Sequence, residues 1–220
     1  MDIFVSTSDE TAISLDKLGM TISIMDVFTP SVILTDLCAR LDWRELFGNG
    51  HPIELDLGAG DGGFALAYAQ QHPGVNLLAV ERLLGRIRKI EKRAVRGKLD
   101  NLRVLRLETG YTVRYLVPPA SVSIAHLLFP DPWPKRRHWP RRLIQPGFVR
   151  DLAAALQPGG ELRFTTDHAP YFETAQQAVA EANVLQRAPD WDWSADPKTD
   201  FQKTFDAEGR PTWRARWVKM

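Results

Sequence analysis

The stretch that decides the fold is Ile53-Glu54-Leu55-Asp56-Leu57-Gly58-Ala59-Gly60-Asp61-Gly62, an apolar run that passes directly into closely spaced glycines. Ile53 to Leu57 predicts a short buried strand, and Gly63 to Gln71 predicts a helix that ends before Pro73. Glycines at alternate positions let the backbone fold sharply and approach a ligand without a Cβ clash. Strand, glycine turn and helix in this order predict a ligand-binding crossover in an α/β protein.

Outward from this stretch, strands and helices alternate along the chain. Strands are expected at residues 76–80, 103–107, 123–129 and 162–166, and helices at 83–94, 146–156 and 171–182. The alternation predicts an α/β fold with a doubly wound, mainly parallel sheet and helices on both faces. Strand-like segments around Val184 and from Trp213 to Val218 predict an antiparallel C-terminal edge.

The N-terminal part does not share this regularity. Residues 1 to about 30 show no sustained apolar period, so residues 1–40 are expected to form a loosely ordered extension, and 41–220 a single domain. The length of 220 residues suits one domain with a substantial core. Val32 to Phe47 has the spacing of a short helix, closed by the turn signal Gly48-Asn49-Gly50.

Composition excludes several classes of protein. Cys38 is the only cysteine, which rules out an internal disulfide and any multi-cysteine metal site, so no metal is expected. The N-terminus has neither a basic lead nor a long apolar run, so the sequence predicts no signal peptide, no membrane helix and a cytoplasmic protein. Nothing in the sequence decides between a monomer and a homodimer.

The charge distribution is uneven although the formal net charge is only +1. Residues 82–98 carry eight basic side chains against Glu91 alone, and residues 132–150 carry six without a single acid. Such cations can simply solvate helix faces. Two basic stretches in one domain favour contact with phosphates, and hence with a nucleic acid.

A carboxylate completes the cofactor signal. Glu81 ends the second expected strand about twenty residues after the glycine turn, where it can accept hydrogen bonds from ribose hydroxyls. The pattern G-x-G-x-G, preceded by Asp56, suits a cofactor without a pyrophosphate, so S-adenosylmethionine fits better than NAD. The alternative is a glycine-rich turn beside an ordinary surface glutamate.

One long motif carries a family resemblance. Leu128-Phe129-Pro130-Asp131-Pro132-Trp133-Pro134-Lys135-Arg136-Arg137-His138 resembles the motif that follows the fourth strand in bacterial tRNA (guanine-N7)-methyltransferases. The likeness extends from about Ile53 to Val218. It implies a Rossmann-like class I methyltransferase that uses S-adenosyl-L-methionine to methylate N7 of a guanine in the tRNA variable loop, with tRNA as partner and RNA-binding as a property.

The same resemblance implies roles for individual residues. Asp131 is implied as the catalytic residue at the junction of cofactor and target base. Cofactor contacts are implied for Asp56, Gly58, Gly60, Glu81, Glu108 and Asp131. Substrate contacts are implied for Lys135, Asp167, Thr199, Asp200, Phe201 and Gln202, the last four in a C-terminal loop. Phosphate contacts are expected from Arg136, Arg137, Arg141 and Arg142.

Three positions depart from the family pattern. Asp56 stands where the family often has Glu, and Glu108 stands where it often has Asp, so both keep a carboxylate with a changed reach. Gln202 stands where the family usually has Glu, which removes a charge and leaves the role of the C-terminal loop open.

The implied chemistry suits these residue types. Guanine N7 carries an in-plane lone pair, so its attack on a sulfonium methyl needs no general base, and positioning should dominate. A fixed carboxylate near the base, such as Asp131, favours the positive charge that moves onto the purine. Asp131 can also bind the N1 and N2 donors of guanine, a pairing that selects guanine over adenine. The alternative is a purely structural role, in which Asp131 is a turn residue before proline.

Several alternatives stay open at this point. Trp133 can stack on a base or fill the core under its loop, and Asp167 can bind RNA hydroxyls or cap the next helix. The chain can also be a class I methyltransferase for another RNA position or a small molecule. A non-catalytic RNA-binding relative is a further alternative, which Asp56, Glu81 and Asp131 argue against and Gln202 leaves open.

Overall fold

The computed structural model describes residues 29–189 and 192–220, which fold around a seven-stranded sheet of order β3-β2-β1-β4-β5-β7-β6. The strands are β1 (Ile53–Leu57), β2 (Asn76–Glu81), β3 (Leu102–Arg106), β4 (Val122–Leu128), β5 (Leu156–Thr166), β6 (Leu185–Ala188) and β7 (Trp213–Lys219). Strands β1 to β5 pair in parallel, and β7 pairs antiparallel with both β5 and β6. The predicted mainly parallel sheet with an antiparallel C-terminal edge is confirmed.

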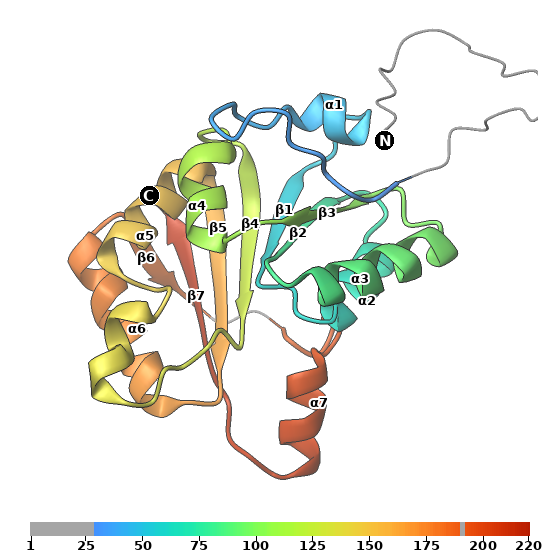
Figure 1. The fold of residues 1–220 in the computed structure, drawn as a ribbon. Coiled ribbons are helices and arrows are strands. Elements are labelled where there is room, and N and C mark those ends of the chain that lie inside the picture. The colour runs from blue at the N-terminus through green and yellow to red at the C-terminus, as the bar shows by residue number, and fades with distance from the viewer. Residues whose placement is uncertain (1–28, 190–191) are drawn as a thin grey trace, which may run out of the picture.

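Helices lie on both faces of this sheet (Figure 1). They are α1 (Trp43–Phe47), α2 (Gly63–Gln71), α3 (Leu84–Gly97), α4 (Thr109–Tyr111), the π-helix η1 (Thr112–Leu116), the 3-10 helix η2 (Arg136–Arg141), α5 (Pro146–Ala155), α6 (Ala169–Ala182) and α7 (Asp200–Ala207). One buried cluster joins α2 and α3 to the sheet, and a second joins η1, α5 and α6 to its other face. The doubly wound arrangement is therefore confirmed.

The sequence explains these layers. Every residue of β1 and β2 is buried, as expected for parallel strands covered on both faces. Helix α3 buries Ile87, Ile90 and Ala94, while its other positions are mostly cationic and exposed. A helix with one apolar stripe packs that stripe on the sheet and leaves its charged face in water.

The helix expected from Val32 to Phe47 is wrong over most of its length, because only α1 forms. Asp42 caps α1 by accepting hydrogen bonds from the backbone N–H groups of Arg44 and Glu45, which fixes the start of the helix. Upstream, Ser31 forms a parallel bridge to Val104 at the outer side of β3. Residues 1–28, most of the expected N-terminal extension, lie outside the described residues.

Two differences concern the C-terminal half. Strand β5 starts at Leu156, six residues earlier than expected, and a register irregularity against β4 absorbs the Gln157-Pro158-Gly159-Gly160 segment. A Cβ on Gly160 would lie 2.9 Å from both the Gln157 and Val122 carbonyl oxygens, so the strands approach too closely there for a side chain. Helix α7 replaces the loop expected around residues 199–202.

The topology fixes where a site can form. Strand β1 pairs with β2 on one side and with β4 on the other, so the chain order of the strands reverses between β1 and β4. In open parallel sheets the loops at the carboxyl ends of strands open a crevice at such a reversal. The loops after β1 and β4 therefore lie at one edge, and α7 lies beyond that same edge (Figure 1).

Candidate active site

The glycine turn after β1 is held by backbone hydrogen bonds. The N–H groups of Gly58 and Ala59 both donate to the Val80 carbonyl, at 2.9 and 3.0 Å, which ties the turn to β2. Gly58 and Gly60 have φ angles of 89° and 58°, a region that favours glycine. A Cβ at either position would meet nothing within 4 Å, so the turn leaves open space for a ligand against its backbone.

Asp56 lies below this turn at the end of β1. Its side chain is 3% exposed, and its Oδ2 has no hydrogen-bond partner within the part of the chain that the structure describes. Burial, and secondly the charge of Glu81, raise the pKa of Asp56 to about 7. An unsatisfied buried carboxyl oxygen beside an open glycine turn fits a ligand that brings a hydrogen-bond donor or a positive charge.

Glu81 links the glycine turn to the start of α3. Its Oε2 accepts from the Gly60 N–H at 3.1 Å, and its Oε1 accepts from the N–H groups of Arg82 and Leu83 at 2.8 and 2.9 Å. The side chain is buried, and the Arg86 guanidinium lies 3.4 Å from Oε2. Three backbone donors hold the carboxylate in place at the ligand-facing edge.

Glu108 follows β3, so it belongs to the same edge of the sheet. It is exposed and caps α4, where its Oε1 accepts from the Gly110 N–H at 2.8 Å and its Oε2 from the Tyr111 N–H at 2.6 Å. The structure thus gives Glu108 a local capping role besides the cofactor contact that the sequence predicts.

The motif loop, residues 129–135, follows β4 with unusual backbone geometry. Phe129 and Trp133 have positive φ angles of 53° and 44°, which L-residues rarely adopt. The Phe129 N–H donates to the Thr165 carbonyl at 2.8 Å, which ties the start of the loop to β5. Between them Asp131 is exposed and forms no hydrogen bond or ion pair with the other described residues, so its carboxylate is available to a substrate.

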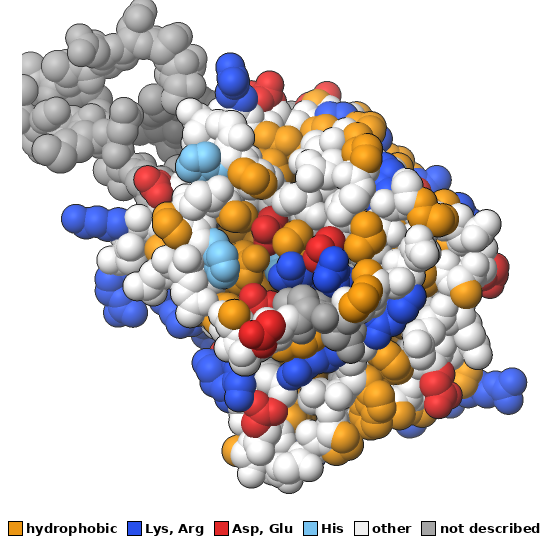
Figure 2. Space-filling view, turned by 180° about the vertical axis from the view of Figure 1, so that it is seen from behind, with side chains coloured by type: hydrophobic (Ala, Val, Ile, Leu, Met, Phe, Trp, Pro, Cys, Tyr) orange, Lys and Arg blue, Asp and Glu red, His pale blue; other side chains and the backbone are white. Residues whose placement is uncertain are grey.

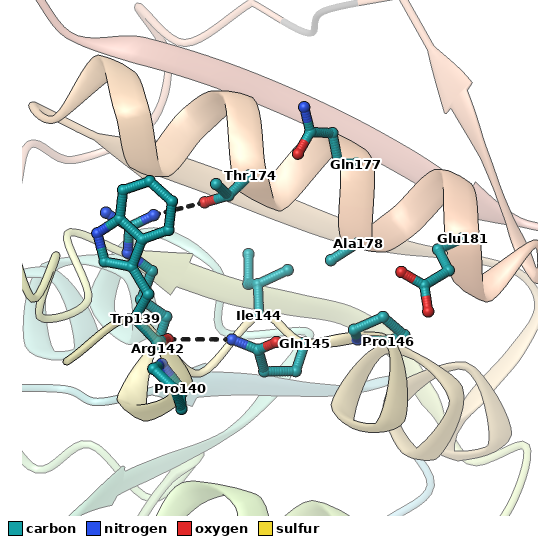
Figure 3. Close-up of a pocket in the computed structure, with 10 residues that line it drawn as sticks. All are labelled: Trp139, Pro140, Arg142, Ile144, Gln145, Pro146, Thr174, Gln177, Ala178 and Glu181. Atoms are coloured by element: carbon teal, nitrogen blue, oxygen red, sulfur yellow. Dashed lines mark hydrogen bonds between the residues drawn. The ribbon is translucent and has the colours of Figure 1, made fainter. Parts of the chain in front are cut away.

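Arg142 differs from the predicted phosphate contact because it is buried, at 2% exposed. Its Nε donates to the Pro132 carbonyl at 2.9 Å and its Nη1 to the Thr174 hydroxyl at 2.7 Å. Its guanidinium also stacks 4.4 Å from the Trp139 ring centroid, at one end of a groove between η2 and α6 (Figure 3). Arg142 therefore braces the motif loop from below.

The other predicted cations of this region lie on or beside η2 and are exposed. They are Lys135, Arg136, Arg137 and Arg141. The Arg141 guanidinium lies 5.1 Å from the centroid of the Trp133 ring, and the His138 ring meets that ring edge-on at 5.7 Å. Trp133 is half-buried in this cluster rather than sunk in the core, so its contact with a base remains a prediction.

Helix α7 brings the four predicted C-terminal substrate residues to the same edge. The Thr199 hydroxyl caps the helix by accepting from the Gln202 N–H at 3.0 Å. A Cβ on Gly63 would lie 2.7 Å from the Asp200 Oδ2, so Asp200 touches the start of α2. Phe201 is 56% exposed with its ring 6.2 Å from that of Phe129, while the Gln202 side chain is buried.

Asp167, after β5, forms an ion pair with Arg210 at 2.7 Å. The alternative that Asp167 caps the next helix is wrong, because the His168 Nδ1 accepts the capping hydrogen bond from the Tyr171 N–H. Arg210 also lies 4.1 Å over the Phe205 ring, so this ion pair connects β5 to the end of α7.

The glycine turn and the motif loop follow neighbouring parallel strands, so they lie at the same edge of the sheet, as the sequence predicts. Ala59 of the glycine turn and Leu128 at the end of β4 pack against the same buried cluster. A hollow of about 330 Å³ lies beside the motif loop and is lined by Phe64 of α2, Phe129 of the motif loop and Gln202 of α7, among others. The structure thus groups the glycine turn, the motif loop and α7 at one edge of the sheet.

Sequence reasoning missed a buried polar pair behind this hollow. The His126 ring of β4 bonds Glu54 Oε2 of β1 at 2.8 Å, and its centroid lies 5.0 Å from that of Phe64. It also missed Arg210 and Asp206, which contact Asp167 and Gln202. Residues 72 apart form the His126 pair, and residues 43 apart form the Arg210 pair. No local sequence pattern predicts these two pairs.

Two further features concern residues 29–189 and 192–220 alone. Among them, no group of three or more His, Cys, Asp or Glu side chains is arranged to hold a metal ion. No helix in those segments has the length and apolar character needed to cross a membrane.

Comparison with known proteins identifies relatives across this whole region. A family model described as "Putative methyltransferase" matches residues 50–215. The tRNA (guanine-N(7)-)-methyltransferase of Exiguobacterium sp. is 33% identical over 182 residues, which cover 80% of this chain and 84% of the relative. The enzyme of the same name from Myxococcus xanthus is 36% identical, over 81% of this chain and 88% of the relative.

Solved structures share the fold at lower identity. The 16S rRNA methyltransferase KamB is 20% identical with a TM-score of 0.61, over 80% of this chain and 92% of that structure. The aminoglycoside resistance methyltransferase NpmB1 is 18% identical with a TM-score of 0.57, over 80% of this chain and 91% of that structure. These likenesses support a methyltransferase fold.

Proposed function

Because the chain belongs to the tRNA (guanine-N(7)-)-methyltransferase family, we propose that it transfers the methyl group of S-adenosylmethionine to N7 of a guanine in the tRNA variable loop. One observation carries the proposal: the open glycine turn and the uncommitted carboxylate of Asp131 lie on loops that open at one edge of the sheet. The domain that does this is proposed to comprise residues 41–220.

The cofactor would be held by the residues around the glycine turn. Glu81, oriented by three backbone N–H groups, would accept hydrogen bonds from the ribose hydroxyls. Asp56 has the unsatisfied oxygen that a cationic ligand can approach, and Gly58 and Gly60 leave the space. The bound cofactor supplies an electrophilic methyl group on a sulfonium centre.

The chain's part in the chemistry is to position the base. Guanine N7 has an unprotonated in-plane lone pair, so no residue has to remove a proton before it attacks. Asp131 would lie beside the purine, where its carboxylate favours the positive charge that the ring acquires. The restricted backbone at Phe129 and the buttress from Arg142 fix the loop that presents Asp131 before RNA arrives.

The tRNA backbone would be bound on two basic surfaces. The η2 surface consists of Lys135, Arg136, Arg137 and Arg141, all exposed. The α3 surface presents Arg88, Lys92 and Arg96, which are exposed and have no ion-pair partner among the described residues. In Figure 2, Lys and Arg side chains project along the left margin, the side to which the 180° turn brings α3 of Figure 1. Cations on both flanks of the site would hold a polyanion across it.

The proposal is tested on the product. Unmodified tRNA transcripts are incubated with the protein and methyl-labelled cofactor, and the digested nucleosides are identified by mass spectrometry. The expected product is labelled N7-methylguanosine, and nuclease fragments map it to the variable loop. Label in any other nucleoside would reject the N7 assignment, while N7-methylguanosine outside the variable loop would reject only the position.

A further inference from the structure

The hollow beneath α7 contains a polar side chain that the proposed chemistry has not yet used. Gln202 is 5% exposed and lines this hollow together with Phe129 and Thr165. At about 330 Å³ the hollow falls at the small end of ligand-sized pockets. It borders the motif loop, where the target base is proposed to lie.

The Gln202 carboxamide is oriented by a residue one helical turn later. Its Nε2 donates to Asp206 Oδ1, and Lys198 Nζ lies 2.8 Å from Asp206 Oδ2. Hydrogen bonds from Lys198 and then Gln202 lower the pKa of Asp206, so the group stays a carboxylate and can only accept. The amide nitrogen must therefore face Asp206.

This orientation leaves the carboxamide oxygen for the hollow. Gln202 Oε1 makes no hydrogen bond to another described residue. Thr165, a residue of the same lining that is 2% exposed, has a buried Oγ1 that likewise has no partner within those residues. A free glutamine could present either its donor or its acceptor, but one held by Asp206 presents an acceptor.

Guanine needs such an acceptor on the edge that Asp131 cannot reach. N7 lies on one edge of the purine, whereas N1–H and the N2 amino group lie on the opposite edge. A carboxylate beside N7 is therefore not the group that binds N1 and N2 in the same complex. A second acceptor on the far side of the base would read the two donors that distinguish guanine from adenine.

We propose that Asp206 is a positioning residue that fixes the Gln202 carboxamide, so that Gln202 Oε1 accepts hydrogen bonds from N1–H and the N2 amino group of the target guanine. The inference rests on the proposed function. It assigns the selection of guanine to a neutral amide. A neighbouring carboxylate and its lysine partner determine that the oxygen of this amide, and not its nitrogen, faces the base.

The test uses transcripts that carry guanosine or inosine at the target position, because inosine keeps N7 and N1–H but lacks the N2 amino group. Methyl transfer to each is measured as kcat/KM. The wild type is expected to prefer guanosine by about tenfold, the effect of one base-edge hydrogen bond. Asp206→Ala frees the amide to rotate, so kcat/KM for guanosine should fall about tenfold and the preference should approach one.

A rescue separates positioning from damage to the helix. In Gln202→Glu/Asp206→Ala both terminal oxygens at position 202 are acceptors whatever their rotation, so the preference for guanosine should return. Glu208→Ala removes an exposed carboxylate from the C-terminal cap of the same helix and should leave both values unchanged.

The outcomes divide cleanly. A wild type without preference for guanosine, an Asp206→Ala variant that keeps it, or a double variant that does not regain it would each overturn the role of Asp206. A wild type that yields no N7-methylguanosine on either transcript would reject the proposed function instead. The first three results leave N7 methylation itself intact, so the two failures are distinguishable.

Discussion

The two loops that form the site are stabilised by different means. The glycine turn after β1 is held by backbone groups of its immediate neighbour β2 and by Glu81 at the end of that strand. The motif loop after β4 is held mainly by two side chains: Arg142, which bonds the Pro132 carbonyl and is itself held by Thr174 of α6, and Phe205 of α7, which packs on Phe129. The first loop is held by backbone hydrogen bonds within one strand-helix-strand unit, whereas the second depends on side chains that α6 and α7 position.

The difference matches the two tasks. A cofactor with a constant shape can be bound by a turn whose geometry is set by backbone hydrogen bonds. In the proposed function, the substrate side places one carboxylate, Asp131, next to a base that belongs to a large and variable molecule. Changes in the motif loop should therefore affect turnover or folding, and changes at the glycine turn should affect cofactor affinity.

The sharpest contrast is expected from Asp131→Ala. Loss of a fixed charge beside the purine should lower kcat by roughly 100- to 1000-fold. Cofactor affinity, measured by calorimetry, should change less than threefold because the turn and Glu81 are untouched. An equal loss of cofactor binding would assign Asp131 to the cofactor site and contradict the distinction between the two loops.

Arg142→Ala tests the side-chain bracing of the motif loop. It removes buried hydrogen bonds to Pro132 and Thr174 and leaves a cavity against Trp139. The free energy of unfolding, from denaturant titration, should fall by about 3 kcal/mol. The exposed neighbour Arg141→Ala is the matched control and should cost less than about 0.5 kcal/mol. Equal stability of the two variants would show that Arg142 does not brace the loop.

The glycine-turn side is tested by pH. The pKa of Asp56 is raised to about 7 in the free protein, so the carboxyl is neutral below and ionised above that pH. A cationic cofactor favours the ionised form, so its dissociation constant should fall about tenfold from pH 6 to pH 8. In Asp56→Asn this slope should vanish, and a slope that persists would assign it to another group.

The same shift has an opposite consequence for the free protein. Because the folded-state pKa of Asp56 lies above the unfolded value, the folded state binds the extra proton. The free energy of unfolding should therefore decrease as pH rises from about 4 through 7, and less so in Asp56→Asn. Chemical denaturation at pH 5 and pH 8 without cofactor measures this difference.

The smallest effect concerns the exposed cations of η2. Arg141→Gln should weaken tRNA binding only about threefold and reduce the slope of log K against log salt by about one. Cofactor affinity should not change. An unchanged slope would mean that Arg141 touches no phosphate.

The same contrast explains how much the sequence could predict. The residue bounds predicted for β1 and α2 agree with the structure, because an apolar run, glycines and Pro73 are all local signals. The edge on which Asp56, Glu81 and Asp131 assemble also followed from the alternation of strands and helices. Parallel strands deliver their carboxyl ends to one edge whatever the details of packing.

Features that depend on distant partners were not predictable in this way. Arg142 resembles its exposed neighbour Arg141 in sequence, and only the packing of Trp139 and Thr174 separates them. Helix α7 has a capping Thr199 but a polar composition, and it is stabilised by Phe205 against the motif loop. Its apolar partner lies too far away in the sequence to mark it as a helix.

The central claim is that cofactor and target base meet between these two loops. It is tested most directly by a structure of the protein with S-adenosylhomocysteine and a tRNA bound. We expect the adenosine sugar at Glu81 and the target guanine beside Asp131, with N7 turned toward the cofactor sulfur. A guanine bound on the far side of the sheet, or a cofactor away from the glycine turn, would contradict the account.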